Sequence, residues 1–158
     1  MESSLNNITP IDGRYKEKSK VLSSYFSEYS FIRYRILVEI EYLISLSKIE
    51  LLDNLTEDEE KYLKSIYQQF SIQDAENVKE IEANIKHDVK SIEYYIKDKI
   101  SKKESLDEKG ISIFVHFALT SQDINNTAYM LMIKSSIHKV LLPKINDILK
   151  KMKEYILE

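Results

Sequence analysis

The segment from Thr120 to the last residue constrains the fold most strongly, because it combines a helical seam with a complete absence of glycine. Mostly apolar residues recur there in alternating steps of four and three, the spacing of one face of a coiled-coil-like helix. The seam consists of Ile124, Ala128, Leu131, Ser135, His138, Leu142, Ile145, Leu149, Met152 and Ile156. A helix of this length is not stable alone in water, so the seam predicts packing against neighbouring helices.

Pro143 interrupts the backbone hydrogen bonds of this predicted helix, and its ring clashes near Lys139, so we expect a kink there. No stop signal follows before Glu158. The seam therefore predicts that the helix belongs to a larger helical architecture than these residues alone.

The composition points to an all-α protein. The chain has 158 residues, with 43% hydrophobic and 31% charged residues, which is ordinary for a globular domain. Only 2 Gly and 2 Pro are present, too few for the many turns of an all-β fold. We expect an irregular arm over residues 1–15, because that stretch has no helical periodicity and contains Pro10 and Gly13.

The same composition argues against several functions. There is no Cys, so a disulfide framework and a thiolate metal site are both excluded, which fits a reducing compartment such as the cytoplasm. The first twelve residues do not resemble a secretory signal, and no apolar run is long enough to span a bilayer. A net charge of -3 argues against binding a nucleic-acid backbone.

Three further helical patterns precede the seam. The first spans about residues 27–47, with a buried stripe and with Arg33, Glu39 and Glu41 off that stripe. The second begins at a capping box, Thr56-Glu57-Asp58-Glu59. The third covers residues 73–100 after a cap at Ser71, as one helix or with a local break near Asn84 to Asp88. Residues 101–110 are polar and are expected to form a loop.

Polar clusters offer candidate chemistry, and each has a purely structural alternative. Arg14, after a glycine, could bind an anion or lie in a surface turn. The His87-Asp88 pair could hold an anion, move a proton or be a surface pair. Thr120-Ser121-Gln122-Asp123 reads as a helix cap or as an anion-binding corner, and His116 stands four residues before it. The sequence has no helical metal-binding motif, so we expect no metal.

Three motifs in the chain occur in a distinctive order. They are Pro10-Ile11-Asp12-Gly13-Arg14-Tyr15, Lys86-His87-Asp88-Val89-Lys90, and His116-Phe117-x-x-Thr120-Ser121-x-Asp123-Ile124-Asn125-Asn126. Together they resemble the adenylosuccinate lyases of the fumarase/aspartase superfamily, in the branch found in many bacteria and some protozoa. The resemblance runs from about residue 5 to the end and covers only the amino-terminal part of such an enzyme.

The resemblance implies a fold, an assembly and a reaction. Residues 1–119 would form an amino-terminal helical domain, and residues 120–158 would begin the central helical bundle of a homotetramer, truncated here. Four subunits would build that bundle, and three would share each active site. The reaction would be β-elimination of fumarate from adenylosuccinate, giving AMP, and from the succinylated carboxamide ribotide of purine synthesis (SAICAR), with no cofactor.

The resemblance also implies roles for individual residues. Arg14 and Tyr15 would contact the phosphate end of the nucleotide. Lys86, His87 and Asp88 would line the pocket, with His87 as the one auxiliary candidate for catalysis. Thr120 and Ser121 would bind a carboxylate of the succinyl group, and His116 would support that corner.

The chain departs from the family pattern in two places. Lys86 stands where close members often have Asn. The general-base Ser, on a mobile Ser-Ser-x-Met-Pro-x-Lys-x-Asn-Pro loop, and the general-acid His have no counterpart in these 158 residues, which are therefore expected to be inactive alone.

Two other readings of the sequence compete with this resemblance. The chain could be a non-enzymatic helical module that pairs with partner helices through its seam. Another member of the superfamily, such as argininosuccinate lyase or fumarase, is disfavoured by residues 12–15 and by the His87-Asp88 pair.

Overall fold

A computed structural model describes residues 6–157 as helices and turns, with no β-strand in that range. The helices are α1 (Lys16–Ser19), η2 (Lys20–Leu22), α2 (Ser23–Phe26), α3 (Glu28–Lys48), α4 (Glu57–Gln68), α5 (Ile72–Ile85), α6 (Asp88–Ser101), α7 (Glu104–Glu108), η3 (Ile111–Phe114), α8 (Ser121–Ser136), the π-helical η4 (Ile137–Leu141) and α9 (Leu142–Leu157). The predicted all-α class is confirmed. None of these helices is both long and apolar enough to cross a membrane.

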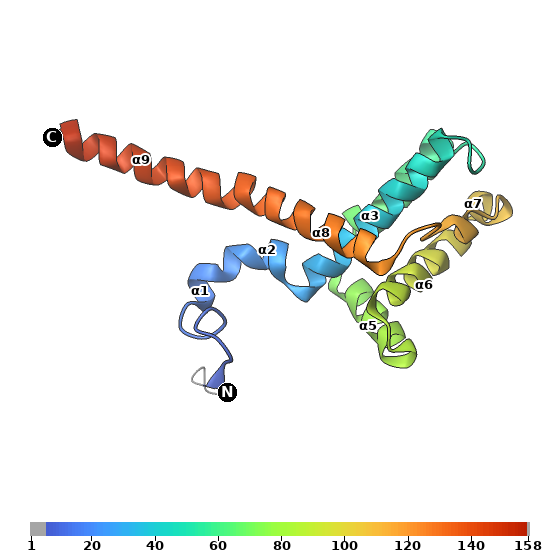
Figure 1. The fold of residues 1–158 in the computed structure, drawn as a ribbon, viewed down its shortest axis with the longest axis horizontal. Coiled ribbons are helices and arrows are strands. Elements are labelled where there is room, and N and C mark those ends of the chain that lie inside the picture. The colour runs from blue at the N-terminus through green and yellow to red at the C-terminus, as the bar shows by residue number, and fades with distance from the viewer. Residues whose placement is uncertain (1–5, 158) are drawn as a thin grey trace.

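The chain forms a helical body from which one long rod projects. Figure 1 shows α3 to α7 clustered in the body, with α8 and α9 leaving it as an almost continuous rod. The amino-terminal arm and α1 lie beyond α2, away from α5 and α6 (Figure 1). Residues 6–15 are turns, as expected for the arm, whereas residues 1–5 lie outside the described range.

Helix α3 is the centre of the body, and one of its faces forms the main core. The predicted stripe is confirmed, because Ile32, Ile36, Ile40 and Leu43 are all buried. They pack in one cluster with apolar residues of α4, α5 and α6. Burial of each such side chain contributes on the order of 1.5–3 kcal/mol, which makes this cluster the main source of stability.

The helix starts follow the capping signals in the sequence. Thr56 caps α4, where its N–H donates to Glu59 Oε2 over 2.8 Å and its hydroxyl accepts from the Glu59 N–H. Ser71 caps α5 in the same reciprocal way with Asp74. Both predicted starts are confirmed, because short polar side chains satisfy N–H groups that have no partner inside the helix.

Residues 101–110 differ from the predicted loop. They contain the short helix α7, whose Leu106 is fully buried against the core. Composition suggested a loop because the stretch is polar, but one buried leucine is enough to hold a single helical turn. Gly110, at φ 63°, ends this turn in the left-handed conformation that favours glycine.

The sequence predicts a kink at Pro143, whereas the structure has a π-helical turn just before it and a rod that continues without ending there. A π-helical turn, Ile137–Leu141, joins α8 to α9 and widens the hydrogen-bond spacing just before the proline. The rod therefore continues past the residue that lacks an N–H.

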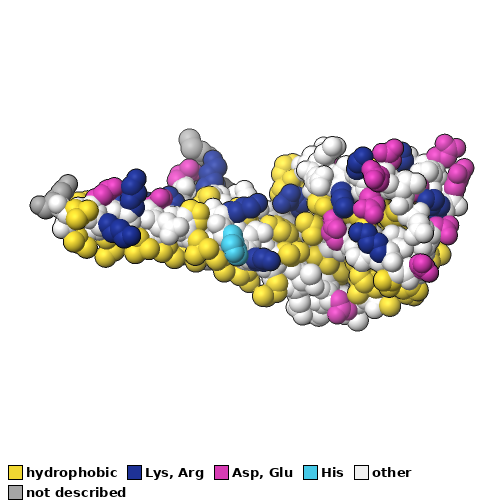
Figure 2. Space-filling view, turned by 90° about the horizontal axis from the view of Figure 1, so that it is seen from above, with side chains coloured by type: hydrophobic (Ala, Val, Ile, Leu, Met, Phe, Trp, Pro, Cys, Tyr) yellow, Lys and Arg dark blue, Asp and Glu magenta, His cyan; other side chains and the backbone are white. Residues whose placement is uncertain are grey.

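The seam is covered only at its beginning. Ile124 and Ala128 are fully buried, and Ala128 packs beside Tyr34 of α3. From Ile137 onward the apolar residues are exposed: Ile137, Leu141, Leu142, Ile145, Leu149, Met152 and Ile156. Figure 2 shows hydrophobic side chains along one edge of the rod. An exposed apolar strip of this length marks an interaction surface.

Glu59 forms an ion pair with Lys109 in which the glutamate side chain is almost completely buried. Burial by itself raises the pKa of Glu59. Hydrogen bonds from Lys109 Nζ at 2.7 Å, the Thr56 N–H and Ser105 outweigh that effect and lower the pKa from an ordinary 4.5 to about 2. Because the folded pKa is depressed, the pair stabilises the fold above pH 4.5, and this contribution is lost as the pH falls toward 2.

We therefore expect Glu59→Gln to lower the free energy of unfolding at pH 7 by about 1–3 kcal/mol in urea titrations. The deficit should shrink at pH 3. Glu57→Gln is the matched control, because Glu57 pairs with Lys61 in solvent and should cost under about 1 kcal/mol. Equal losses for the two variants would contradict the role of the Glu59 pair.

Candidate functional site

A sharp break between α5 and α6 exposes the first candidate cluster. The sequence left open one helix or a local break, and the structure has the break. Lys86 adopts the left-handed conformation at φ 56°. His87 then caps α6, because its Nδ1 accepts the Lys90 N–H over 3.1 Å. The break places both side chains and the start of α6 at the surface.

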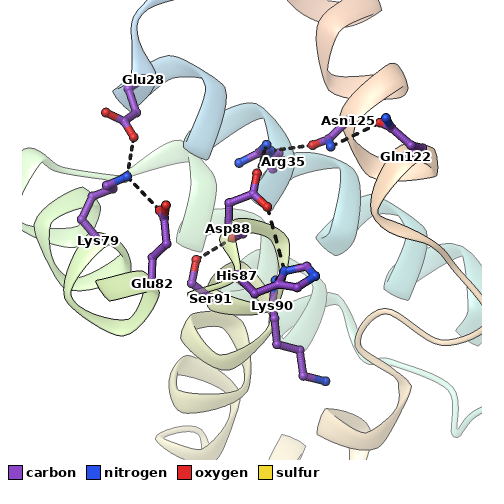
Figure 3. A network of polar contacts seen from close by, with 10 residues as sticks. All are labelled: Glu28, Arg35, Lys79, Glu82, His87, Asp88, Lys90, Ser91, Gln122 and Asn125. Atoms are coloured by element: carbon purple, nitrogen blue, oxygen red, sulfur yellow. Dashed lines mark hydrogen bonds and ion pairs between the residues drawn. The ribbon is translucent and has the colours of Figure 1, made fainter. Parts of the chain in front are cut away.

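Asp88, the first residue of α6, carries a stabilised negative charge. Partial burial raises its pKa, but the positive charge of Arg35, the Val89 N–H and the Arg35 hydrogen bond outweigh that effect and lower it. Asp88 Oδ2 lies 2.6 Å from Arg35, and Oδ1 lies 3.9 Å from His87 Nδ1 (Figure 3). The carboxylate therefore pairs with a buried arginine and lies near an exposed histidine, whose Nδ1 is occupied by the Lys90 N–H.

The second cluster is the corner at the start of α8. Thr120 is the N-cap, and its N–H and hydroxyl donate to Asp123 Oδ2 over 2.7 and 2.8 Å. These bonds lower the pKa of Asp123 and confirm the predicted cap. Since Thr120 already donates to Asp123, Ser121 and the N–H groups of the first turn are the groups better placed to bind an added anion.

The loop before this corner has an unusual backbone and is tied to α3. His116 and Ala118 have φ of 64° and 56°, which costs non-glycine residues of order 1 kcal/mol each. Two contacts hold the loop in place: His116 Nδ1 lies 2.5 Å from Glu39 Oε1, and the Tyr42 hydroxyl donates to the Phe117 carbonyl over 3.0 Å. Both contacts come from one face of α3 and fix the entry into α8.

Glu39 was predicted to lie off the buried stripe of its helix, and this prediction is wrong. Its side chain is buried, and Oε2 has no hydrogen-bond partner among residues 6–157. Burial raises the pKa of Glu39, against the opposing effect of the His116 contact. Sequence reasoning missed Glu39 because a lone glutamate beside an apolar stripe normally faces solvent.

Arg35 was missed altogether, although it joins the two clusters. Its Nη2 donates to Asp88 at the start of α6, and its Nε donates to Asn125 Oδ1, in the first turns of α8, over 2.9 Å (Figure 3). Its side chain is 7% exposed. The one signal in the sequence is the spacing of Arg35, Glu39 and Tyr42, which puts three polar side chains on one helix face.

Arg14 and Tyr15 do not join these clusters within the chain. They end a turn in which the Tyr15 N–H donates to the Pro10 carbonyl, and Arg14 lies over the Tyr15 ring at 5.4 Å. Figure 1 places this arm beyond α2, away from α6. His138 is exposed on the rod and contacts the carbonyl of Lys134. The structure thus links Asp88 to Asn125 of α8 through Arg35 and ties His116 to α3, whereas the arm makes none of these contacts.

The two clusters offer groups that can bind an anionic ligand. Two helix starts, at Asp88 and Ser121, present N–H groups, and a hydroxyl and two imidazoles lie on the same elements. Within the described range, no group of three or more His, Asp or Glu side chains is placed to hold a metal ion. Free N–H groups at helix starts, with a serine hydroxyl nearby, can bind carboxylates or phosphates.

Comparison with known proteins agrees with this chemistry. A family model described as lyase matches residues 13–156. The chain is 49% identical over 150 residues to an adenylosuccinate lyase of Dictyostelium discoideum, which covers 90% of this chain and 32% of that protein. It is 44% identical over 153 residues to that of Legionella pneumophila (strain Corby), covering 93% and 32%, and 40% identical over 144 residues to that of Escherichia coli (strain K12), covering 89% and 31%.

The match over most of its length shows that the chain belongs to the lyase family, with the all-α fold of the fumarase/aspartase type. Within this family, the relatives it resembles are adenylosuccinate lyases, as its motifs predict. The chain spans about a third of the length of these curated relatives.

The conformation of Lys86 leads to a prediction about stability. A lysine pays a steric cost in the left-handed region that glycine avoids and asparagine tolerates better. We expect Lys86→Gly to raise the free energy of unfolding by about 0.5–1 kcal/mol and Lys86→Asn by less, in urea titrations.

The matched control is Lys61→Gly, because Lys61 is an exposed lysine inside α4 with helical geometry. Glycine there should destabilise by about 1 kcal/mol. A destabilising effect of the same size at Lys86 would show that the lysine side chain contributes more than its backbone strain costs.

Proposed function

We propose that this chain supplies part of an adenylosuccinate lyase, which eliminates fumarate from adenylosuccinate to give AMP, and from SAICAR. The observation that supports the proposal is the Arg35 bridge, which joins Asp88 at the start of α6 to Asn125 in the first turns of α8. The family match and the identity to adenylosuccinate lyases support the same reaction.

The donors at these helix starts suit the charges of such a substrate. Adenylosuccinate carries a phosphate and two carboxylates, and elimination adds negative charge to the carboxylate beside the abstracted proton. Preorganised N–H and O–H donors aimed at that charge lower the barrier. We assign the succinyl carboxylate chiefly to Ser121 and the first turn of α8, with Thr120 holding the turn and His116 supporting it.

The other end of the substrate would meet the remaining predicted residues. Lys86, His87 and Asp88 would line the pocket, and His87 could assist catalysis from its place at the cap of α6. Arg14 and Tyr15 would contact the phosphate. Because the arm lies apart from the clusters in this chain, we propose that these two residues serve a pocket on another copy.

The proposed assembly is a homotetramer in the cytoplasm, acting on small molecules without a cofactor and without nucleic-acid or membrane partners. Residues 1–119 would form the amino-terminal domain, and residues 120–158 would enter a central bundle. The exposed hydrophobic edge of α9 supports this, because it requires cover by other helices. The general-base Ser loop and general-acid His would come from other parts of the enzyme.

The exposed edge also favours the competing function, a non-enzymatic helical module. The two readings differ in a single measurement. A full-length protein containing this chain should release fumarate from adenylosuccinate if it is a lyase, and should show no release if it is only an interaction module. The isolated 158 residues are expected to show no turnover under either reading.

Substitution of Ser121 tests the assignment of the corner. Ser121→Ala in the full-length enzyme should lower kcat/KM for adenylosuccinate by roughly 100-fold, because it removes a donor to developing charge. Ser101→Ala, at the far end of α6, should leave fumarate release unchanged. Wild-type kinetics in the Ser121 variant would remove Ser121 from the site.

The hydrophobic edge can be tested by the size of the assembly. Ile145→Asp combined with Leu149→Asp would bury two charges in the proposed bundle, at a cost of several kcal/mol per subunit. We expect sedimentation analysis of the full-length protein to show loss of the tetramer. Lys150→Asp, outside the seam, is the control, and an intact tetramer in the double variant would show that α9 is not an interface.

A further inference from the structure

Arg35 is placed to control the spacing between two elements that carry separate parts of the proposed pocket. Its guanidinium spans from Asp88 on α6 to Asn125 on α8, at 2.6 and 2.9 Å. Asp88 follows His87 directly, and Asn125 lies one helical turn after Ser121. The guanidinium therefore contacts both the helix that follows His87 and the helix that begins at Ser121.

The surroundings of Arg35 hold its guanidinium in a single orientation. The guanidinium carbon lies 3.7 Å from the centre of the Phe31 ring, and Phe31 stacks on Tyr129 of α8 at 4.4 Å. Asn125 also donates to Gln122 over 3.3 Å, which fixes the amide (Figure 3). Since the arginine is almost completely buried, it is not itself available to contact a ligand.

The contacts between α3 and α8 form an ordered series. Phe31 meets Tyr129, Arg35 meets Asn125, and Tyr42 meets Phe117 just before α8. Residue numbers increase along α3 while those of the partners decrease, so the two segments run antiparallel. Arg35 is the member of this series that also bonds to α6, because it alone reaches Asp88.

We propose that Arg35 is a positioning residue that sets the separation between the His87-Asp88 pair and the Thr120-Ser121 corner. It thereby matches the pocket to a ligand that spans both, such as a nucleotide joined to a dicarboxylate. The inference rests on the proposed function. Lysine cannot replace arginine here, because a single ammonium group cannot bond to Asp88 and Asn125 with the fixed geometry of a planar fork.

The test is steady-state kinetics of Arg35→Met and Arg35→Lys in the full-length enzyme. Arg35→Met should raise KM for adenylosuccinate roughly 10- to 100-fold, the scale expected when binding groups are misplaced by about 1 Å. Arg35→Lys should recover part of the loss through Asp88. Inhibition by AMP alone and by fumarate alone should change less than about 3-fold, because each product occupies only one side of the pocket.

This pattern separates positioning from a merely structural role. Loss of folded enzyme would lower the apparent kcat and leave KM and both inhibition constants unchanged. Local collapse of the pocket would weaken the binding of AMP and fumarate as much as the binding of the substrate. Either result would overturn the proposal. Arg33→Met is the matched control, since Arg33 lies on the same helix, packs over Tyr34 and makes no ion pair within residues 6–157. It should keep wild-type kinetics.

A second variant guards against failure of Arg35→Met to fold. Asn125→Ala removes only the α8 side of the bridge and leaves the pair between Arg35 and Asp88 intact. It should raise KM in the same direction by a smaller factor, and unchanged KM here would also overturn the inference. If the wild-type enzyme releases no fumarate, the proposed function fails, whereas an active wild type with unaltered variants defeats only the role of Arg35.

Discussion

The site depends on a row of polar side chains on an otherwise apolar helix. One face of α3 places Ile36 and Ile40 in the core that joins α4, α5 and α6. Another face presents Arg35, Glu39 and Tyr42, which reach Asp88, Asn125, His116 and the Phe117 carbonyl. The same rigid element therefore stabilises the body and fixes the site, so the site residues inherit the rigidity of the core.

Burying the charged members of this row, Arg35 and Glu39, lowers the stability of the fold unless each charge is paired. Burying a charge costs several kcal/mol unless it is paired, and an apolar row of similar volume would often be at least as stable. Arg35 offsets the cost through Asp88, Asn125 and Phe31. Glu39 does so less completely, since burial raises its pKa and one oxygen has no partner among residues 6–157. Stability alone does not account for such an arrangement, whereas orientation of the proposed site would.

The sequence predicted those parts of the fold that depend on local physics. Helix periodicity located the buried face of α3, and the caps at Thr56, Ser71 and Thr120 were read correctly because each involves residues only three positions apart. The sequence did not decide between one helix and a break at Lys86, because the left-handed position is occupied by a lysine and not by a glycine. The turn α7 was missed because its stability comes from the distant packing of a single side chain, Leu106.

The site was predicted only in part, for the same physical reason. The motifs led to His87, Asp88, His116 and Ser121, whose shared role in one pocket stays a prediction. Arg35 bonds to Asp88 and Asn125, which are 53 and 90 residues away, so its local sequence offers only the spacing with Glu39 and Tyr42 and does not reveal these partners.

The two ends of the rod differ in their packing. At its start, α8 is packed on α3, and its first turn is held by Thr120 and Asp123. Farther on, the rod has no cover and presents an apolar edge. Forces applied at that edge by another helix would be transmitted along a continuous helix to Asn125 and then to Arg35 and Asp88. If the assembly and the pocket are as proposed, the same bridge would connect them mechanically.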